Sequence, residues 1–245
     1  MNYRQAVFAI ALACGSATTV AYAGPRAVIE LFTSQGCSSC PPADRLLGEL
    51  AQDPSLITMS LPVDYWDYLG WKDTLALHGH SKRERAYATV RGDREVYTPQ
   101  VVVNGLIHVL GSDKEAIEGA IETSRSENAP LKLPVSLSIS DGTVTVQVPD
   151  AVGDRRSGEV WLCPVTAKVP VEIERGENRG RTLTYTNVVR RWIKLGDWTG
   201  KAQTFTANLA DLVKDNEIDR VDVLVQDGVA ARPGMMLGAA TANVH

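Results

Sequence analysis

Two cysteines separated by two residues, Cys37 and Cys40, stand between an apolar stretch and a helical one. Residues 27–32 are almost all apolar and predict a short buried strand. After the second cysteine, apolar residues recur along residues 43–51 with the spacing of a buried helix face. The cysteine pair is therefore expected where a strand gives way to a helix N-terminus.

Hydrophobic periodicity, two capping boxes and an Asn-Gly turn divide the first half of the chain into seven elements. Strands and helices alternate, except that two strands follow each other through the Asn-Gly turn. The predicted elements are a strand over 27–32, a helix carrying 43–51, a strand over 56–63, a helix from Ser81, strands over 100–103 and 107–110, and a helix from Ser112. This order is β-α-β-α-β-β-α.

The pattern changes after Pro130. From Pro134 onward, short alternating stretches and turns predominate, with Val135, Leu137 and Ile139 separated by serines. Several strands of this kind predict an antiparallel sandwich. We therefore expect two domains, residues 24–128 and a β-rich domain over 129–245.

The N-terminus has the features of a secretory signal peptide over residues 1–23. Arg4 supplies a positive charge, residues 6–13 are apolar, and Ala21-Tyr-Ala23 is a cleavage site of the A-x-A type. We expect a periplasmic or secreted protein without a membrane span. Removal of this segment takes Cys14 with it and leaves three cysteines. In an oxidising compartment, the adjacent pair can form a disulfide.

The net charge of −4 and the absence of a dominant Lys/Arg cluster argue against nucleic acid as a partner. The cysteine pair instead favours a thiol or disulfide substrate, either a protein or a small thiol. A helix N-terminus lowers the pKa of a nearby thiol, and a two-residue spacer keeps both sulfurs within bonding reach. Cys37 is then the nucleophile and Cys40 the thiol that resolves the mixed disulfide.

Other interpretations of the cysteine pair remain open. It can be a passive structural disulfide in a non-catalytic interaction module. It can also bind Cu(I) in a metallochaperone, with His78 or His108 as a third ligand. A zinc site needs two more ligands, and the sequence holds neither a second C-x-x-C nor an H-x₃₋₅-H motif. We therefore expect no metal site and no cofactor.

Thr98 and Pro99 directly precede the predicted strand over residues 100–103. A proline at a strand start removes one backbone donor, and such prolines can be cis. Beside a dithiol, Pro99 would expose the backbone of Thr98 to an extended substrate, with Tyr97 next to it. The alternative is an ordinary trans proline that begins a strand.

Glu30 and Trp66 are two further candidates. Glu30 lies in mid-strand, seven residues before Cys37, where a buried carboxylate of raised pKa can take the proton of the resolving thiol. The alternative is an edge-strand glutamate that faces water. Trp66 belongs to the aromatic and acidic segment 64–71, which either walls a substrate groove or packs over the sheet.

Four stretches of the chain resemble the secreted thioredoxin-like family catalogued as domain of unknown function 1223. They are Glu30 to Asp44 (ELFTSQGCSSCPPAD), Val63 to Asp73 (VDYWDYLGWKD), Val96 to Gly105 (VYTPQVVVNG) and Gly176 to Leu183 (GENRGRTL). The resemblance covers nearly all of the mature chain. It implies an α/β thioredoxin-like N-terminal domain and an all-β, sandwich-like C-terminal domain, and it does not supply a substrate.

The cysteine motif departs from that of thioredoxins, which have an aromatic residue before the first cysteine and Gly-Pro between the two. Here those positions are Gly36 and Ser38-Ser39. Pro41 and Pro42 indicate that the helix begins at Pro41, because proline is tolerated in the first turn. That start leaves Cys37 in a loop, with weaker stabilisation by the helix dipole. The expected function is thiol-disulfide exchange.

Overall fold

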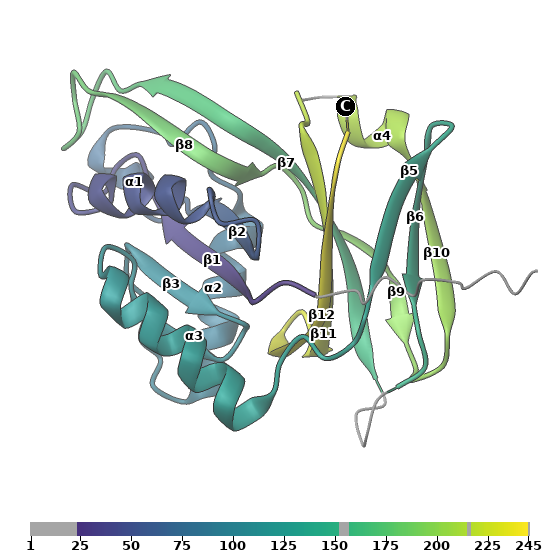
Figure 1. Ribbon diagram of the computed structural model, residues 1–245. Helices are drawn as coiled ribbons and strands as arrows, with labels where there is room; N and C mark the ends of the chain where they lie inside the picture. Colours follow the sequence, from purple (N-terminus) through teal and green to yellow (C-terminus); the bar gives the residue numbers. More distant parts are fainter. Residues whose placement is uncertain (1–23, 152–156, 215–216, 245) are drawn as a thin grey trace, which may run out of the picture.

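The computed structural model describes residues 24–151, 157–214 and 217–244 (Figure 1). The predicted signal peptide, residues 1–23, lies outside them. The elements, in chain order, are β1 (Ala27–Thr33), α1 (Pro41–Leu50), β2 (Leu56–Pro62), the 3₁₀ turn η1 (Asp67–Leu69), α2 (His78–Arg91), β3 (Gln100–Val103), β4 (Ile107–Leu110), α3 (Lys114–Asn128), β5 (Ser136–Ser140), β6 (Thr143–Val148), β7 (Gly158–Glu172), β8 (Thr182–Val189), β9 (Ile193–Trp198), β10 (Gln203–Asn208), α4 (Leu209–Val213), β11 (Arg220–Val229) and β12 (Arg232–Asn243).

Most of the described strands belong to one mixed sheet. Eight of its nine strands follow the order β12-β11-β7-β8-β2-β1-β3-β4, and β9 pairs with β7 beside them. β1 is parallel to β2 and antiparallel to β3. The two halves of the chain meet where β2 and β8 pair, at Ser60 and Val188. The sheet therefore runs without a break from the first half of the chain into the second.

Helices cover both faces of the sheet around β1, because alternate residues of this strand point to opposite sides. Ile29 and Leu31 pack in one apolar cluster with α1 and α3. Val28 and Phe32 pack in another with Tyr87 of α2, and this cluster extends to Leu224 of β11 and Met236 of β12. α1 and α2 therefore lie on opposite faces of the sheet.

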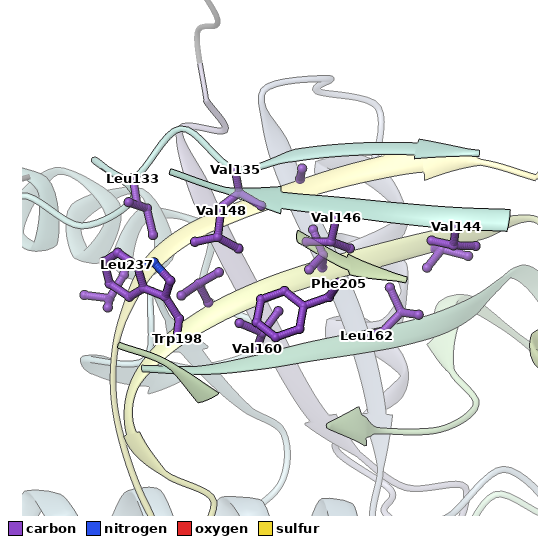
Figure 2. Close-up of a cluster of buried hydrophobic side chains, with 14 of the residues drawn as sticks. Leu133, Val135, Val144, Val146, Val148, Val160, Leu162, Trp198, Phe205 and Leu237 are labelled. Carbon is purple, nitrogen blue, oxygen red and sulfur yellow. The ribbon is translucent and has the colours of Figure 1, made fainter. Parts of the chain in front are cut away.

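A second, three-stranded sheet has the order β10-β6-β5 and lies against the β7, β11 and β12 end of the large sheet (Figure 1). Figure 2 shows the core between them, where valines of β6 meet Val160 and Leu162 of β7. Trp198 and Phe205 fill the space between the two sheets. Both rings are nearly inaccessible, which fixes the two sheets face to face.

The prediction of a thioredoxin-like α/β domain followed by an all-β sandwich domain was wrong. Of the described residues, 42% lie in strands and 22% in helices, and the nine-stranded sheet contains strands of both halves. The physical reason is that β2 has a second edge, which must form backbone hydrogen bonds with another strand. This strand is buried along its whole length, and β8 pairs with the edge that β1 leaves free.

Long-range strands account for the rest of the error. β7 continues past Pro164 and Pro170 to Glu172, so one 15-residue strand pairs with β8, β9 and β11. The strand over 232–243 is rich in glycine and alanine, two residues that are depleted in strands, so its composition does not predict a strand. No helix of the described part of the chain is long and apolar enough to cross a membrane.

Candidate functional site

Cys37 and Cys40 form a disulfide at the start of α1, with their Cα atoms 5.4 Å apart. Cys40 is the N-cap residue and the helix begins at Pro41, as the two prolines predicted. The loop between the cysteines is a tight turn, in which the amide N–H of Cys40 donates to the carbonyl of Cys37 at 3.3 Å. Cys37 therefore lies in the turn before the helix and not in its first turn.

The first turn of α1 has no free backbone donor for a thiolate. Positions 41 and 42 are prolines, which have no N–H. The amides of Ala43 and Asp44 both donate to the carbonyl of Cys40, at 2.8 and 3.1 Å. The helix N-terminus therefore stabilises a Cys37 thiolate only weakly, because its first-turn N–H groups are either missing or already bonded to the carbonyl of Cys40.

Both sulfur-bearing residues are almost inaccessible, whereas the two serines between them are exposed. The exposed fraction is 2% for Cys37 and 0% for Cys40. The loop of residues 173–181 between β7 and β8, which we call the covering loop, contacts the backbone of this turn. It brings a segment of the second half of the chain onto the C-x-x-C turn.

Asn178 holds the covering loop in place. Its side-chain amide donates to the carbonyl of Gln35 at 2.9 Å and to that of Cys37 at 2.8 Å. Asn178 is fully buried, and Arg181 donates to its side-chain oxygen at 3.1 Å. Beside it, the Glu177 carboxylate accepts from the amide of Ser38 at 3.2 Å. Sequence reasoning missed Asn178, although it lies in the Gly176–Leu183 stretch that resembles the family.

The Thr98-Pro99 peptide is cis and lies beside the same turn. The Ser39 hydroxyl is 3.4 Å from the Cys37 sulfur, and it donates to the carbonyl of Thr98 at 3.5 Å. Trp66 Nε1 donates to the Thr98 hydroxyl at 2.8 Å. The structure thus brings together Cys37, Cys40, Thr98, Pro99 and Trp66, five of the residues that the sequence singled out.

The aromatic side chains around this turn have different surroundings. Trp66 stacks on Tyr68, whose side chain is 77% exposed, with the ring planes 16° apart. Tyr97 turns away, because its hydroxyl lies 3.2 Å from Nδ1 of His108. Trp66 and Tyr68 therefore form an exposed aromatic edge near the disulfide, and the Tyr97 ring does not contribute to it.

Glu30 is not part of the site. Its carboxylate accepts from Arg83 Nε at 2.6 Å and from the Tyr87 hydroxyl at 2.6 Å, and both partners belong to α2. Residues 29 and 31 of the same strand face α1, so Glu30 points to the opposite face. The proposed role as proton acceptor for Cys40 therefore requires another carboxylate.

Asp44 is the buried carboxyl that α1 offers beside Cys40, and sequence reasoning missed it. It follows Cys40 by four residues, one helical turn, so the two side chains lie on the same side of α1. Its Oδ1 accepts from the Thr33 hydroxyl at 2.8 Å, and its buried Oδ2 has no partner among the described residues. Burial raises the pKa of Asp44 to about 7. A buried carboxyl that titrates near neutrality is suited to proton transfer.

The described residues do not gather ligands for a metal ion. No cluster of three or more His, Cys, Asp or Glu side chains is present among them. Of the two histidines considered as copper ligands, His78 lies 2.8 Å from Asp64 and His108 lies 3.3 Å from Asp93. The third cysteine, Cys163, is free and buried in the apolar cluster under α2, where burial raises its pKa far above the usual range.

A family described as a protein of unknown function, DUF1223, matches residues 28–226. The chain belongs to the DUF1223 family. The match includes the cysteine motif, the segment around Pro99 and the covering loop, so the site lies within the part of the chain that defines the family.

The solved structures that resemble the chain include the following two. The crystal structure of protein AGR_C_4864 from Agrobacterium tumefaciens is 30% identical, covers 89% of this chain and 94% of its own, and has a TM-score of 0.78. HBP35 of Porphyromonas gingivalis is 12% identical, covers 89% and 75%, and has a TM-score of 0.58. The second likeness shows similarity of fold alone. No curated protein matches the chain.

Proposed function

We propose that the protein is an exported thiol-disulfide oxidoreductase that acts through Cys37 and Cys40. The observation that carries the proposal is the disulfide at the N-terminus of α1, with the Ser39 hydroxyl placed between the Cys37 sulfur and the Thr98 carbonyl. The sequence of residues 1–23, with its A-x-A site, supports export. An oxidising compartment allows such a pair to cycle between dithiol and disulfide.

Exchange starts from the dithiol form. The Cys37 thiolate attacks one sulfur of a substrate disulfide, and the other substrate sulfur leaves as a thiolate that takes a proton from water. Cys40 then loses its proton to the Asp44 carboxylate and attacks the Cys37 sulfur. The second substrate thiol is released, so the substrate gains two electrons and the Cys37–Cys40 disulfide forms. An external thiol or dithiol reductant restores the starting state.

The surroundings of Cys37 favour the reducing direction. A strong oxidant stabilises its thiolate form, which raises its reduction potential. Here the first turn of α1 has no free N–H, and Glu177 occupies the amide of Ser38 with a negative charge. A poorly stabilised thiolate lowers the reduction potential, so we propose a reductant of protein or small-molecule disulfides.

We propose that the covering loop limits access to the disulfide, because it binds the backbone beside Cys37 and the exposed fraction of Cys37 is only 2%. The contacts that hold the loop are two hydrogen bonds from Asn178 and one to Glu177. Movement of this loop exposes the Cys37 sulfur next to the aromatic edge of Trp66 and Tyr68. A substrate disulfide flanked by apolar residues would be held there.

The test is an equilibrium titration of the cysteine pair against a glutathione series, with alkylation and mass spectrometry to count free thiols. We expect a reduction potential between about −200 and −270 mV, the range of glutaredoxins and thioredoxin. A potential below about −300 mV would identify a structural disulfide and contradict the proposed activity. The Cys163→Ala variant serves as the control, since it leaves the Cys37–Cys40 pair as the one titrating couple.

Replacement of Asp44 with asparagine tests the proton acceptor. The ordinary pKa of 3.8 rises to about 7 in the folded protein, so Asp44 favours the folded state below about pH 4, and this contribution is lost as pH rises through 7. Asp44→Asn should therefore gain stability over the wild type between pH 4 and 8, by up to about 4 kcal/mol. Urea unfolding at several pH values measures the gain.

The same variant should slow the second step of exchange, because Cys40 loses its proton acceptor, and mixed disulfide should accumulate. Asp141→Asn, in the exposed turn between β5 and β6, is the matched control and should change neither property. A stability difference that does not vary with pH would show that Asp44 is ionised in the folded protein and is not the proton acceptor.

A further inference from the structure

A cavity of about 530 Å³ lies between α2, the residue Trp192 that connects β8 to β9, and the turn between β11 and β12. We call it the tryptophan cavity, and its main lining residues are Lys82, Arg85, Ala86, Trp161, Trp192 and Ala231. Its volume is in the range of sites that hold small organic molecules. α2 covers the sheet face opposite α1, so the cavity is separate from the cysteine site.

The aromatic part of the cavity is fixed in place. Trp161 and Trp192 meet edge to face, with ring centroids 6.1 Å apart. The Arg83 guanidinium lies 4.2 Å from the Trp192 ring centroid and is itself anchored by the buried Glu30 carboxylate. A ligand would therefore meet a preformed apolar surface and would not have to order these rings, which lowers the cost of binding.

The charge of the cavity has one sign. Lys82 and Arg85 are exposed on α2 at its edge, and no acidic residue lines it. The positive charge of Arg83 is already matched by Glu30. Neither Lys82 nor Arg85 forms a salt bridge within the part of the chain that the structure describes. The edge thus carries two cations outside any salt bridge above a largely apolar interior, although the Arg85 guanidinium also lies 5.5 Å from the Tyr65 ring centroid and interacts electrostatically with Glu84.

We propose that the tryptophan cavity binds an organic anion with an apolar body, such as an aromatic carboxylate or sulfonate. The apolar body would pack on Trp161, Trp192 and Ala86, where burial of its surface is favourable. The anionic group would lie at the edge near Lys82 and Arg85, which supply charge-assisted hydrogen bonds. This site is independent of the proposed disulfide exchange.

Fluorescence titration with 8-anilinonaphthalene-1-sulfonate, an aromatic sulfonate, tests the inference on the folded protein. We expect saturable binding of one probe per chain. N-phenyl-1-naphthylamine has the same ring system without the sulfonate and should bind at least about tenfold more weakly, as loss of one charge-assisted contact predicts. Equal affinity for the two probes would overturn the assignment, as would the absence of saturable binding by the sulfonate.

Two variants place the probe in this cavity. Lys82→Gln with Arg85→Gln should weaken binding of the sulfonate about tenfold or more and leave the weak binding of the neutral probe unchanged. Lys168→Gln with Lys201→Gln removes the same charge from two other exposed sites and should have no effect. Ala86→Phe fills the interior and should abolish binding of both probes. Unchanged sulfonate binding in the first double variant or in Ala86→Phe would refute the site.

Discussion

Cys37→Ser should abolish disulfide reduction, with kcat/KM falling at least about 10³-fold, because the attacking thiolate is lost. A serine hydroxyl remains protonated at neutral pH and does not attack a disulfide. The measurement is the rate of reduction of a small disulfide and of a protein disulfide, each with an excess of a thiol reductant. Stability should change by no more than the loss of one short-range disulfide explains.

Cys40→Ser should differ from Cys37→Ser in kind. Cys37 remains available for attack, so the variant should form a mixed disulfide with the substrate and fail to release it. Mass spectrometry after acid quenching detects this adduct. Cys163→Ser is the matched control, because this thiol is buried and free and should not take part. Equal activity of Cys37→Ser and the wild type would contradict the proposed function, as would turnover that depends on Cys163.

Arg83→Met should destabilise the protein by about 3–5 kcal/mol, because it leaves the Glu30 carboxylate buried without its cation. Glu30 is fully buried, and Arg83 is only 8% exposed. Arg83 also donates to the Tyr87 hydroxyl at 2.7 Å and to the side-chain oxygen of Gln226 at 2.9 Å. The group thus ties α2 to strands β1 and β11. A lowered midpoint in urea unfolding measures the loss.

The double variant Glu30→Leu with Arg83→Met should recover much of that stability, because no unpaired charge remains in the interior. Arg85→Met, two positions along α2, is the matched control and should cost little, since its guanidinium is exposed. Disulfide exchange by the double variant should match the wild type. A loss of exchange without a loss of stability would return Glu30 to the catalytic site and contradict its placement on the opposite face.

Much of the first half of the chain could be predicted because its signals are local. Apolar periodicity and the Asn104-Gly105 turn each depend on residues within a few positions of one another. The two capping boxes were wrong, because α2 begins at His78, three residues before Ser81, and Asp113 rather than Ser112 caps α3. The start of α1 at Pro41 is a case where one residue type decided a boundary, because proline fits only the first turn of a helix. The candidate dithiol followed from the same local pattern.

The errors concern residues whose partners lie far away in the sequence. Glu30 was interpreted as a group beneath the dithiol, yet its partners are Arg83 and Tyr87 on the other face of β1. A strand residue contacts whichever helix covers its face of the sheet. The sequence of the strand alone does not predict which helix that is. Asp44 was missed for a different reason. Its position one helical turn after Cys40 can be read from the sequence, but its burial cannot.

The sequence by itself determined the order of the first elements, the cysteine pair at a strand-to-helix junction and the membership of the DUF1223 family. Only the tertiary structure decided that β8 extends the sheet from β2, that Asn178 holds a distant loop over Cys37, and that two tryptophans far apart in the chain line one cavity. The physical reason is that helix starts and turns are set by backbone sterics over a few residues. Sheet edges and buried polar groups are instead satisfied by whichever distant segment packs against them.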